Sequence, residues 1–232
     1  MYNDLYLIGD VFMCGRYTLT REASELQKTF LLEEFPADWA PRYNIAPGQM
    51  APVITNEAPR RAQLFRWGLI PSWAKDVAIG WRLINARSET VREKPAYRAA
   101  FQKRRCLILA DGFFEWQRPA GRQAKGVPYY FCLKDKQPFA FAGLWEIWQS
   151  SEGKIFSCTI ITTDSNGLVR DVHERMPVIL LPESYQLWLD QLPPAQHIKL
   201  LRPLQSDLIV SYPVTQLVNR VDQDVPQCIE PL

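Results

Sequence analysis

Apolar and polar residues alternate along much of this chain, and a period of two residues is typical of β-strands. Alternation in residues 14–20 predicts an opening strand. Other runs are rich in β-branched and aromatic residues and are separated by Gly, Pro and charged turns, which predicts further strands. These runs are residues 53–55, 62–67, 105–111, 113–117, 129–133, 139–144, 156–163 and 177–181.

Helical spacing occurs in fewer places. In residues 21–32 the apolar side chains recur every three or four positions, which predicts an amphipathic helix. Because helices and strands follow each other without a βαβ rhythm, we predict an α+β fold with a largely antiparallel sheet. Pro and Gly interrupt residues 42–48 and 68–73, which are predicted as irregular segments. Shorter helices are predicted at residues 88–94, 165–169 and 183–189.

Length and composition suit one globular domain, because 232 residues with 47% hydrophobic side chains can bury a sizeable core. The five cysteines are odd in number and widely spaced, which argues against a disulfide framework and favours a reducing, cytoplasmic location. With only two histidines and no paired acids, we predict no metal and no cofactor. No apolar run reaches the length of a membrane span, so we expect no contact with a membrane.

The charge is distributed unevenly. The whole chain carries only +2, yet residues 60–105 contain twelve basic residues against three acidic ones. A concentrated positive field of this kind attracts phosphates whatever the net charge, although solvated loops would give the same composition. Trp67 and Trp73 lie in this segment beside Gly68 and Pro71, and we expect both rings to be exposed and able to stack on the bases of single-stranded nucleic acid.

Cys14 follows Met13 directly, so a start at Met13 with removal of that methionine would leave Cys14 at the amino terminus. Its amine and its thiol would then stand on adjacent carbons. The amine, with an ordinary pKa of about 7.7 to 8.0, can condense with an aldehyde, and the thiol can close a five-membered thiazolidine ring. The alternative is an ordinary buried cysteine in a first strand.

Three more residues are candidates for chemistry. Glu115 lies within an aromatic strand, where burial would raise the pKa of its carboxyl and suit it to proton transfer, unless it faces solvent at a sheet edge. His173 lies in a charged stretch before a strand and is the natural acid or base, although a surface histidine would look the same. Asn85, framed by apolar residues, is otherwise a turn or cap residue. We interpret His197, in a predicted helix, as structural.

Six motifs in order along the chain resemble those of the SRAP family, the SOS response-associated peptidases that process abasic sites. The resemblance covers nearly all of the chain from Met13 onward. It implies a barrel-like pair of β-sheets with flanking helices in a single domain. The motifs are Met13-Cys14-Gly15-Arg16-Tyr17, Arg42-Tyr43-Asn44-Ile45-Ala46-Pro47-Gly48, Trp67-Gly68-Leu69-Ile70-Pro71, Ile84-Asn85-Ala86-Arg87-Ser88-Glu89-Thr90, Asp111-Gly112-Phe113-Phe114-Glu115-Trp116 and His173-Glu174-Arg175-Met176-Pro177.

The resemblance implies a covalent thiazolidine crosslink between an amino-terminal cysteine and the aldehyde of an abasic site in single-stranded DNA, with lyase chemistry through the imine. It makes Cys14 the nucleophile, Glu115 and His173 the proton-transfer groups, and Asn85 the group that positions the amine or sugar. It also implies that the DNA backbone is held by Arg16, Arg87 and Thr162, and that the lesion pocket is shaped by Asn44, Pro47 and Trp67.

Twelve residues precede Met13, and a Cys14 whose nitrogen lies in a peptide bond cannot form the imine. We therefore expect residues 1–12 to be an extension upstream of the true start, or a segment removed by self-processing, and residues 13–232 to be the SRAP domain. We expect a monomer whose partner is abasic single-stranded DNA. Two other hypotheses remain: a cysteine peptidase using Cys14 and His173, and a non-catalytic binder of single-stranded nucleic acid.

Overall fold

The computed structural model describes residues 15–117 and 126–232. Within them, five strands pair in a ring and close a barrel, in the order β10, β4, β3, β6, β9 and back to β10. Neighbouring strands run antiparallel, except that β10 and β4 are parallel. The barrel strands are β3 (Met50–Thr55), β4 (Ala58–Trp67), β6 (Arg105–Ala110), β9 (Phe139–Ser150) and β10 (Gly153–Asp164).

Three short strands extend the barrel at its rim. β5 (Asn85–Arg87) runs parallel to β10, and β11 (Arg175–Pro177) runs antiparallel to it. Residue Thr162 of β10 is therefore paired on both sides, with Arg87 and with Pro177. The third, β12 (Ile179–Leu180), pairs with β9.

A second, antiparallel sheet packs against the barrel. Its order is β13-β8-β7-β1-β2, and β6 of the barrel leads into β7 through Asp111. The core between the two sheets is aromatic: Tyr17 meets Trp67 and Phe141 edge to face, with ring centroids 5.3 and 5.7 Å apart. The strands are β1 (Arg16–Leu19), β2 (Arg42–Ile45), β7 (Gly112–Gln117), β8 (Val127–Leu133) and β13 (Ile209–Pro213).

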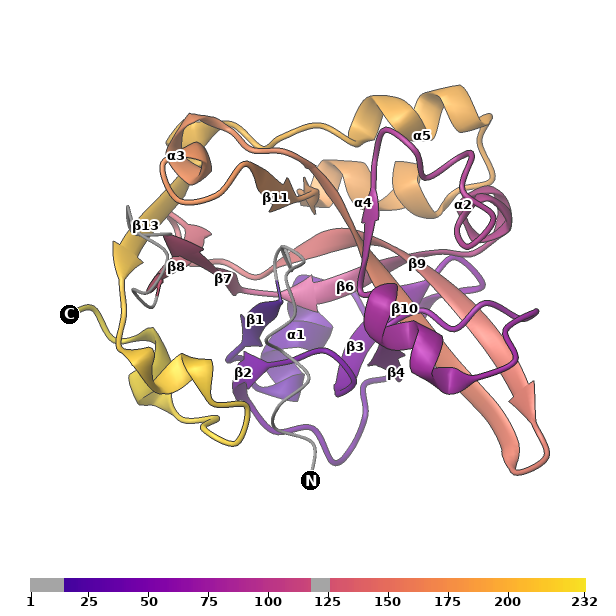
Figure 1. Ribbon diagram of the computed structural model, residues 1–232, viewed down its shortest axis with the longest axis horizontal. Coiled ribbons are helices and arrows are strands. Elements are labelled where there is room, and N and C mark those ends of the chain that lie inside the picture. The colour runs from indigo at the N-terminus through magenta and orange to yellow at the C-terminus, as the bar shows by residue number, and fades with distance from the viewer. Residues whose placement is uncertain (1–14, 118–125) are drawn as a thin grey trace.

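The helices are short and lie outside the sheets. In Figure 1, α4 and α5 (orange) run along one side of the barrel, and α4 contacts β6 and β9. The yellow C-terminal segment lies beside β2. The helices are α1 (Ala23–Thr29), α2 (Arg98–Lys103), α3 (Gly167–Arg170), α4 (Pro182–Leu189) and α5 (Pro194–Leu200), and the 3₁₀ helices are η1 (Val77–Arg82), η2 (Ser206–Leu208), η3 (Gln216–Asn219) and η4 (Pro226–Ile229).

A fully buried arginine joins the helices to the barrel. The Arg105 guanidinium donates hydrogen bonds of 2.7 to 2.9 Å to backbone carbonyls of α2 and to those of Trp188 and Asp190 in and after α4. Beside it, the ring of the buried His197 packs against Phe101 and Trp188. Burial and the nearby Arg105 charge lower the pKa of His197. This confirms our interpretation of His197 as a structural residue.

The structure confirms the predicted α+β fold, with a barrel-like pair of mostly antiparallel sheets and flanking helices in one domain. Two local predictions are wrong. Residues 88–94 form a series of turns, and the helix starts later, at Arg98. The irregular segment 42–48 contains strand β2, which is held by pairing with β1 more than twenty residues earlier. No helix in the described ranges is long and apolar enough to cross a membrane.

Candidate functional site

Strand β1, which begins two residues after Cys14, lies against β7, the strand that carries Glu115. Cys14 itself lies outside the described residues, but Gly15 and Arg16 follow it directly. Arg16 pairs with Phe114 across β1 and β7, and Glu115 is the next residue along β7. Glu115 is only 2% exposed and lies on a strand with neighbours on both sides, so the solvent-facing alternative is wrong.

Asp111, the residue between β6 and β7, fixes where β1 ends. Its buried carboxylate accepts hydrogen bonds of 2.6 Å from the Thr18 hydroxyl, the Thr20 hydroxyl and the Thr20 backbone N–H. Such charge-assisted bonds are stronger than neutral ones. Asp111 therefore holds β1 in one register against β7.

His173 lies in the loop between α3 and β11. Its Nδ1 lies 3.1 Å from the backbone nitrogen of Arg175 and 3.3 Å from the carbonyl oxygen of the same residue, so the Arg175 backbone fixes the orientation of the ring. Gln117 Nε2, two residues after Glu115, donates a bond of 3.1 Å to the Asp171 carbonyl, two residues before His173. These contacts bring the histidine loop to the end of β7.

Asn85 and Arg87 lie on β5 at the barrel rim. Asn85 is half-buried, and its carbonyl accepts a hydrogen bond of 2.9 Å from the Tyr97 hydroxyl. Arg87 is exposed, as a phosphate contact requires. Thr162, which pairs with Arg87, is completely buried in this conformation, and its contact with DNA stays a prediction. Its physical role is to support Arg87 from the neighbouring strand.

The two tryptophans expected to stack on bases differ in how exposed their side chains are. Trp73 is 58% exposed, as expected. Trp67 is 1% exposed, so its expected exposure is wrong. Its indole Nε1 donates a hydrogen bond of 2.9 Å to the Ile84 carbonyl, and its ring packs on Tyr17. Trp67 thus lies behind the site and joins β1 to the residue before Asn85.

Arg16 and Asn44 bind the C-terminal segment. The Arg16 guanidinium donates to the carbonyls of Val218 and Asn219 and to Asn44 Oδ1. Asn44 is fully buried, and its side-chain amide donates to three carbonyls of residues 218–223, at 2.7 to 3.3 Å. Asn44 thus binds this segment to β2, and Pro47, three residues further on, is also buried; that both shape a lesion pocket stays a prediction.

Sequence reasoning missed three residues that organise the site. Asp224 accepts from the backbone N–H groups of Tyr43 and Asn44, at 2.6 and 2.9 Å. Arg175 binds the Glu89 carboxylate and the Thr162 carbonyl, which joins β11 to the turn after β5. Partial burial acts to raise the pKa of Glu89, but the hydrogen bonds and charge of Arg175 outweigh it and lower that pKa.

The third is Asn219, which contacts both strands of the site. Its side-chain oxygen accepts from Trp116, and its carbonyl accepts from Arg16. Of these residues only Arg175 lies inside a recognised motif; the other two are separated from their partners by more than a hundred residues, and no local pattern indicates them.

The basic segment divides into two groups. Arg60 and Arg61 pair with Glu33 and Glu34, Arg104 pairs with Glu146, and Arg105 is buried. The remaining basic residues form no ion pair with the part of the chain that the structure describes, and all except the half-buried Arg66 are exposed. They are Arg66, Lys75, Arg82, Arg87, Arg92, Lys94, Arg98 and Lys103.

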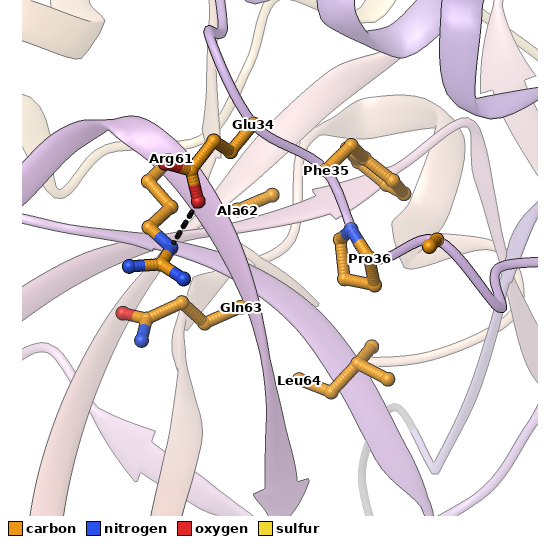
Figure 2. A pocket seen from close by; sticks show the side chains of 8 residues that line it. Glu34, Phe35, Pro36, Arg61, Ala62, Gln63 and Leu64 are labelled. Atoms are coloured by element: carbon orange, nitrogen blue, oxygen red, sulfur yellow. Dashed lines mark ion pairs between the residues drawn. The ribbon is translucent and has the colours of Figure 1, made fainter.

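A surface hollow of about 380 Å³ lies elsewhere, between residues 34–37 and 61–64 (Figure 2). The ion pair of Arg61 Nε with Glu34 Oε2, 2.8 Å, spans its rim. It contains none of the candidate residues. Among the described residues, no group of three or more His, Cys, Asp and Glu side chains is placed to hold a metal ion.

The structure is a five-stranded barrel with a second sheet packed against it, and it places the buried Glu115 on the strand beside β1 and the His173 loop at the end of that strand. The family described as SOS response associated peptidase (SRAP) matches residues 13–221. The chain belongs to this family.

Proteins similar in sequence to this chain are named abasic site processing proteins. Abasic site processing protein YoqW of Bacillus subtilis is 42% identical over 94% of this chain and 99% of its own length. Abasic site processing protein HMCES of Xenopus tropicalis is 30% identical over 94% of this chain and 78% of its own length. A solved structure of a protein from Bacteroides thetaiotaomicron superposes with a TM-score of 0.84 at 27% identity, covering 94% of this chain and all of that one.

Proposed function

We propose that this protein recognises abasic sites in single-stranded DNA and captures them covalently through an amino-terminal Cys14. The observation that carries the proposal is that relatives covering nearly the whole chain are named abasic site processing proteins. Glu115 on the strand beside β1, and the His173 loop at the end of that same strand, support it, because each reacting step needs a proton donor or acceptor.

The chemistry joins one aldehyde to one cysteine with loss of one water. The neutral Cys14 amine adds to the aldehyde carbon of the ring-opened abasic sugar, and the resulting carbinolamine loses water to give an imine. The Cys14 thiol then adds across the C=N bond: sulfur bonds to carbon, and the proton goes to nitrogen. The product is a thiazolidine.

Glu115 and His173 divide the proton transfers. Water can leave the carbinolamine only after its hydroxyl gains a proton, and the buried Glu115 is the acid on the strand beside β1. His173 donates a proton to the sugar oxygen during ring opening. Asn85 positions the amine or the sugar from the barrel rim.

The mechanism needs a free Cys14 amine, so residues 1–13 must be absent from the functional polypeptide. The family match starts at residue 13, which supports translation from Met13. The peptidase in the family description supports the other route, in which the protein removes its own leading residues. Both routes end at the same amino terminus.

The same imine would also give the protein lyase activity. Before the thiol closes the ring, the imine acidifies the adjacent carbon of the sugar, and loss of that proton expels the 3′ phosphate by β-elimination. The competition between ring closure and elimination then decides whether the DNA strand remains intact. The thiol of Cys14 is therefore the group that protects the strand.

A gel experiment tests the proposal directly. Protein with a verified Cys14 terminus is mixed with a single-stranded oligonucleotide that contains one abasic site, and the mixture is denatured. The proposal expects a shifted band that survives denaturation, and no band with the undamaged oligonucleotide. Peptide cleavage without this band would favour the cysteine peptidase, and reversible binding alone would favour the non-catalytic binder.

A further inference from the structure

The basic segment contains an exposed tryptophan that the proposed chemistry does not use. Among the tryptophans of residues 60–105, Trp67 is buried and Trp73 is already a candidate for stacking. Trp81, on η1, is 44% exposed. An aromatic ring with this much exposed surface can bind a ligand by stacking.

Two glycines hold Trp81 in place. Gly48, whose φ is +82°, lies against the ring so closely that a Cβ at this position would overlap Cη2 of Trp81. The turn before Trp81 is fixed in the same way, since a Cβ at Gly68 would lie 2.7 Å from the Gly80 carbonyl oxygen. The indole is therefore positioned by backbone packing, which lowers the entropy lost when a ligand stacks on it.

Arg66 supplies the charge next to this ring. Its guanidinium carbon lies over the indole, 5.4 Å from the ring centroid. Its Nε is buried without a hydrogen-bond partner, and within the described ranges the side chain forms no ion pair. Arg60 and Arg61, on the same strand, are both neutralised by glutamates. No carboxylate in the described ranges therefore compensates the charge of Arg66, and an anion would meet its terminal guanidinium nitrogens rather than the buried Nε.

The pair lies close to the strand from Cys14. Gly48 N–H donates a hydrogen bond of 2.7 Å to the Trp67 carbonyl, and the Trp67 ring contacts Tyr17. Gly48 is also only three residues from Ile45, the partner of Tyr17 in β1, and three residues span at most about 10 Å. A DNA strand in the site would reach Trp81 within a few nucleotides.

From these observations we infer that Trp81 and Arg66 form a binding subsite for one unpaired nucleotide, whose base stacks on Trp81 and whose phosphate pairs with Arg66. The inference rests on the proposed function, because it takes the single DNA strand as the occupant. The exposed cations Arg82 and Arg87 lie on the same segment and complement the strand's charge. Bases inside a duplex are covered by their neighbours, so the subsite selects single strands.

The test uses undamaged DNA, so that it does not depend on the crosslink. The affinity of the protein for an oligothymidylate of about twelve nucleotides is measured by anisotropy for the parent, Trp81→Ala and Trp81→Phe, with thermal melting as a check on folding. Stacking on one base predicts a loss of roughly 5- to 100-fold for Trp81→Ala and a smaller loss for Trp81→Phe. Arg66→Ala should weaken binding and reduce the magnitude of the log-log salt slope by about 0.7. Arg61→Ala should change neither the affinity nor the salt slope.

Unchanged affinity in Trp81→Ala, or equal losses in Arg61→Ala and Arg66→Ala, would overturn the inference. If Trp81→Ala melts early, photocrosslinking of the parent to an oligonucleotide containing 5-iododeoxyuridine decides instead: the labelled peptide should contain Trp81, and labelling elsewhere alone contradicts the subsite. A parent that binds undamaged strands as inferred but makes no adduct with abasic DNA would reject the proposed function and leave the subsite standing.

Discussion

The indole Nε1 of Trp116 donates a hydrogen bond of 2.7 Å to Asn219 Oδ1, and the Asn219 carbonyl accepts one from Arg16. One residue near the C-terminus thus holds the strand of Glu115 and the strand from Cys14 together. Asn44 and Asp224 bind the same loop to β2. The arrangement of β1 and β7 therefore depends on a segment far away in sequence.

Replacing Asn219 by Ala removes the acceptor for Trp116 and should slow crosslinking at saturating abasic DNA more than it weakens DNA binding. Because the bond is exposed, the free energy of unfolding should fall by only about 0.5–1.5 kcal/mol. Rates and affinities measured separately check this. Asn219→Asp, which keeps an acceptor for Trp116, is the matched control and should retain most of the rate; equal rate losses in the two variants would show that this hydrogen bond does not position the strands.

Trp67→Phe should destabilise the protein by roughly 1–3 kcal/mol, because the buried Ile84 carbonyl loses its donor. Urea unfolding measures the loss. The variant keeps an aromatic ring against Tyr17, so the effect isolates the indole hydrogen bond rather than the packing. Parent-like stability would mean that another donor replaces Nε1. Since Ile84 precedes Asn85, crosslinking should slow as well.

The buried His197 predicts a pH dependence of stability. Burial and Arg105 lower its pKa below the ordinary value of 6.5, so the unfolded chain takes up a proton more readily than the folded one. Its contribution to stability is complete above pH 6.5 and is lost progressively as the pH falls through the lowered folded pKa. The melting temperature of the parent should therefore drop more between pH 7 and pH 5 than that of His197→Gln. Parallel curves for the two proteins would contradict this.

Glu115→Gln should slow adduct formation by about 10²- to 10⁴-fold, the range of general acid-base catalysis, since the amide cannot give or take the proton. Quenched time courses with abasic oligonucleotide give the rate. Glu146→Gln is the control: Glu146 is another buried carboxylate, on β9, and pairs with Arg104 instead of lying near β1. A similar slowing in both variants would indicate a general effect of removing a buried carboxylate.

Local sequence patterns predict the strands, because alternation and aromatic content report directly on a sheet with a buried face, but they leave open whether Glu115 is buried or faces solvent. They fail for Trp67, where Gly68 and Pro71 indicate an exposed loop although the indole finds a backbone acceptor inside the protein. Nor do they indicate that Thr162 is paired on both sides, by β5 and by β11.

The contacts of Asp224 are long-range, and no local sequence pattern indicates them. Its two backbone partners lie 180 and 181 residues earlier, and only the folded chain brings them together. The charge pattern has a similar limit: a count of basic residues in 60–105 cannot separate Arg60 and Arg61, which glutamates neutralise, from Arg66, which has no such partner among the described residues.

The central claim is that the amine and the thiol of Cys14 act together on the abasic aldehyde. Intact-mass measurement of the adduct tests it most directly, using protein that begins at Cys14, its Cys14→Ser variant, and a form with one stable residue before Cys14. The account predicts an unreduced adduct of protein plus DNA minus one water for the parent, an adduct only after borohydride for Cys14→Ser, and none for the capped form. An unreduced, heat-stable adduct of Cys14→Ser or of the capped protein, formed at the parent rate, would contradict it.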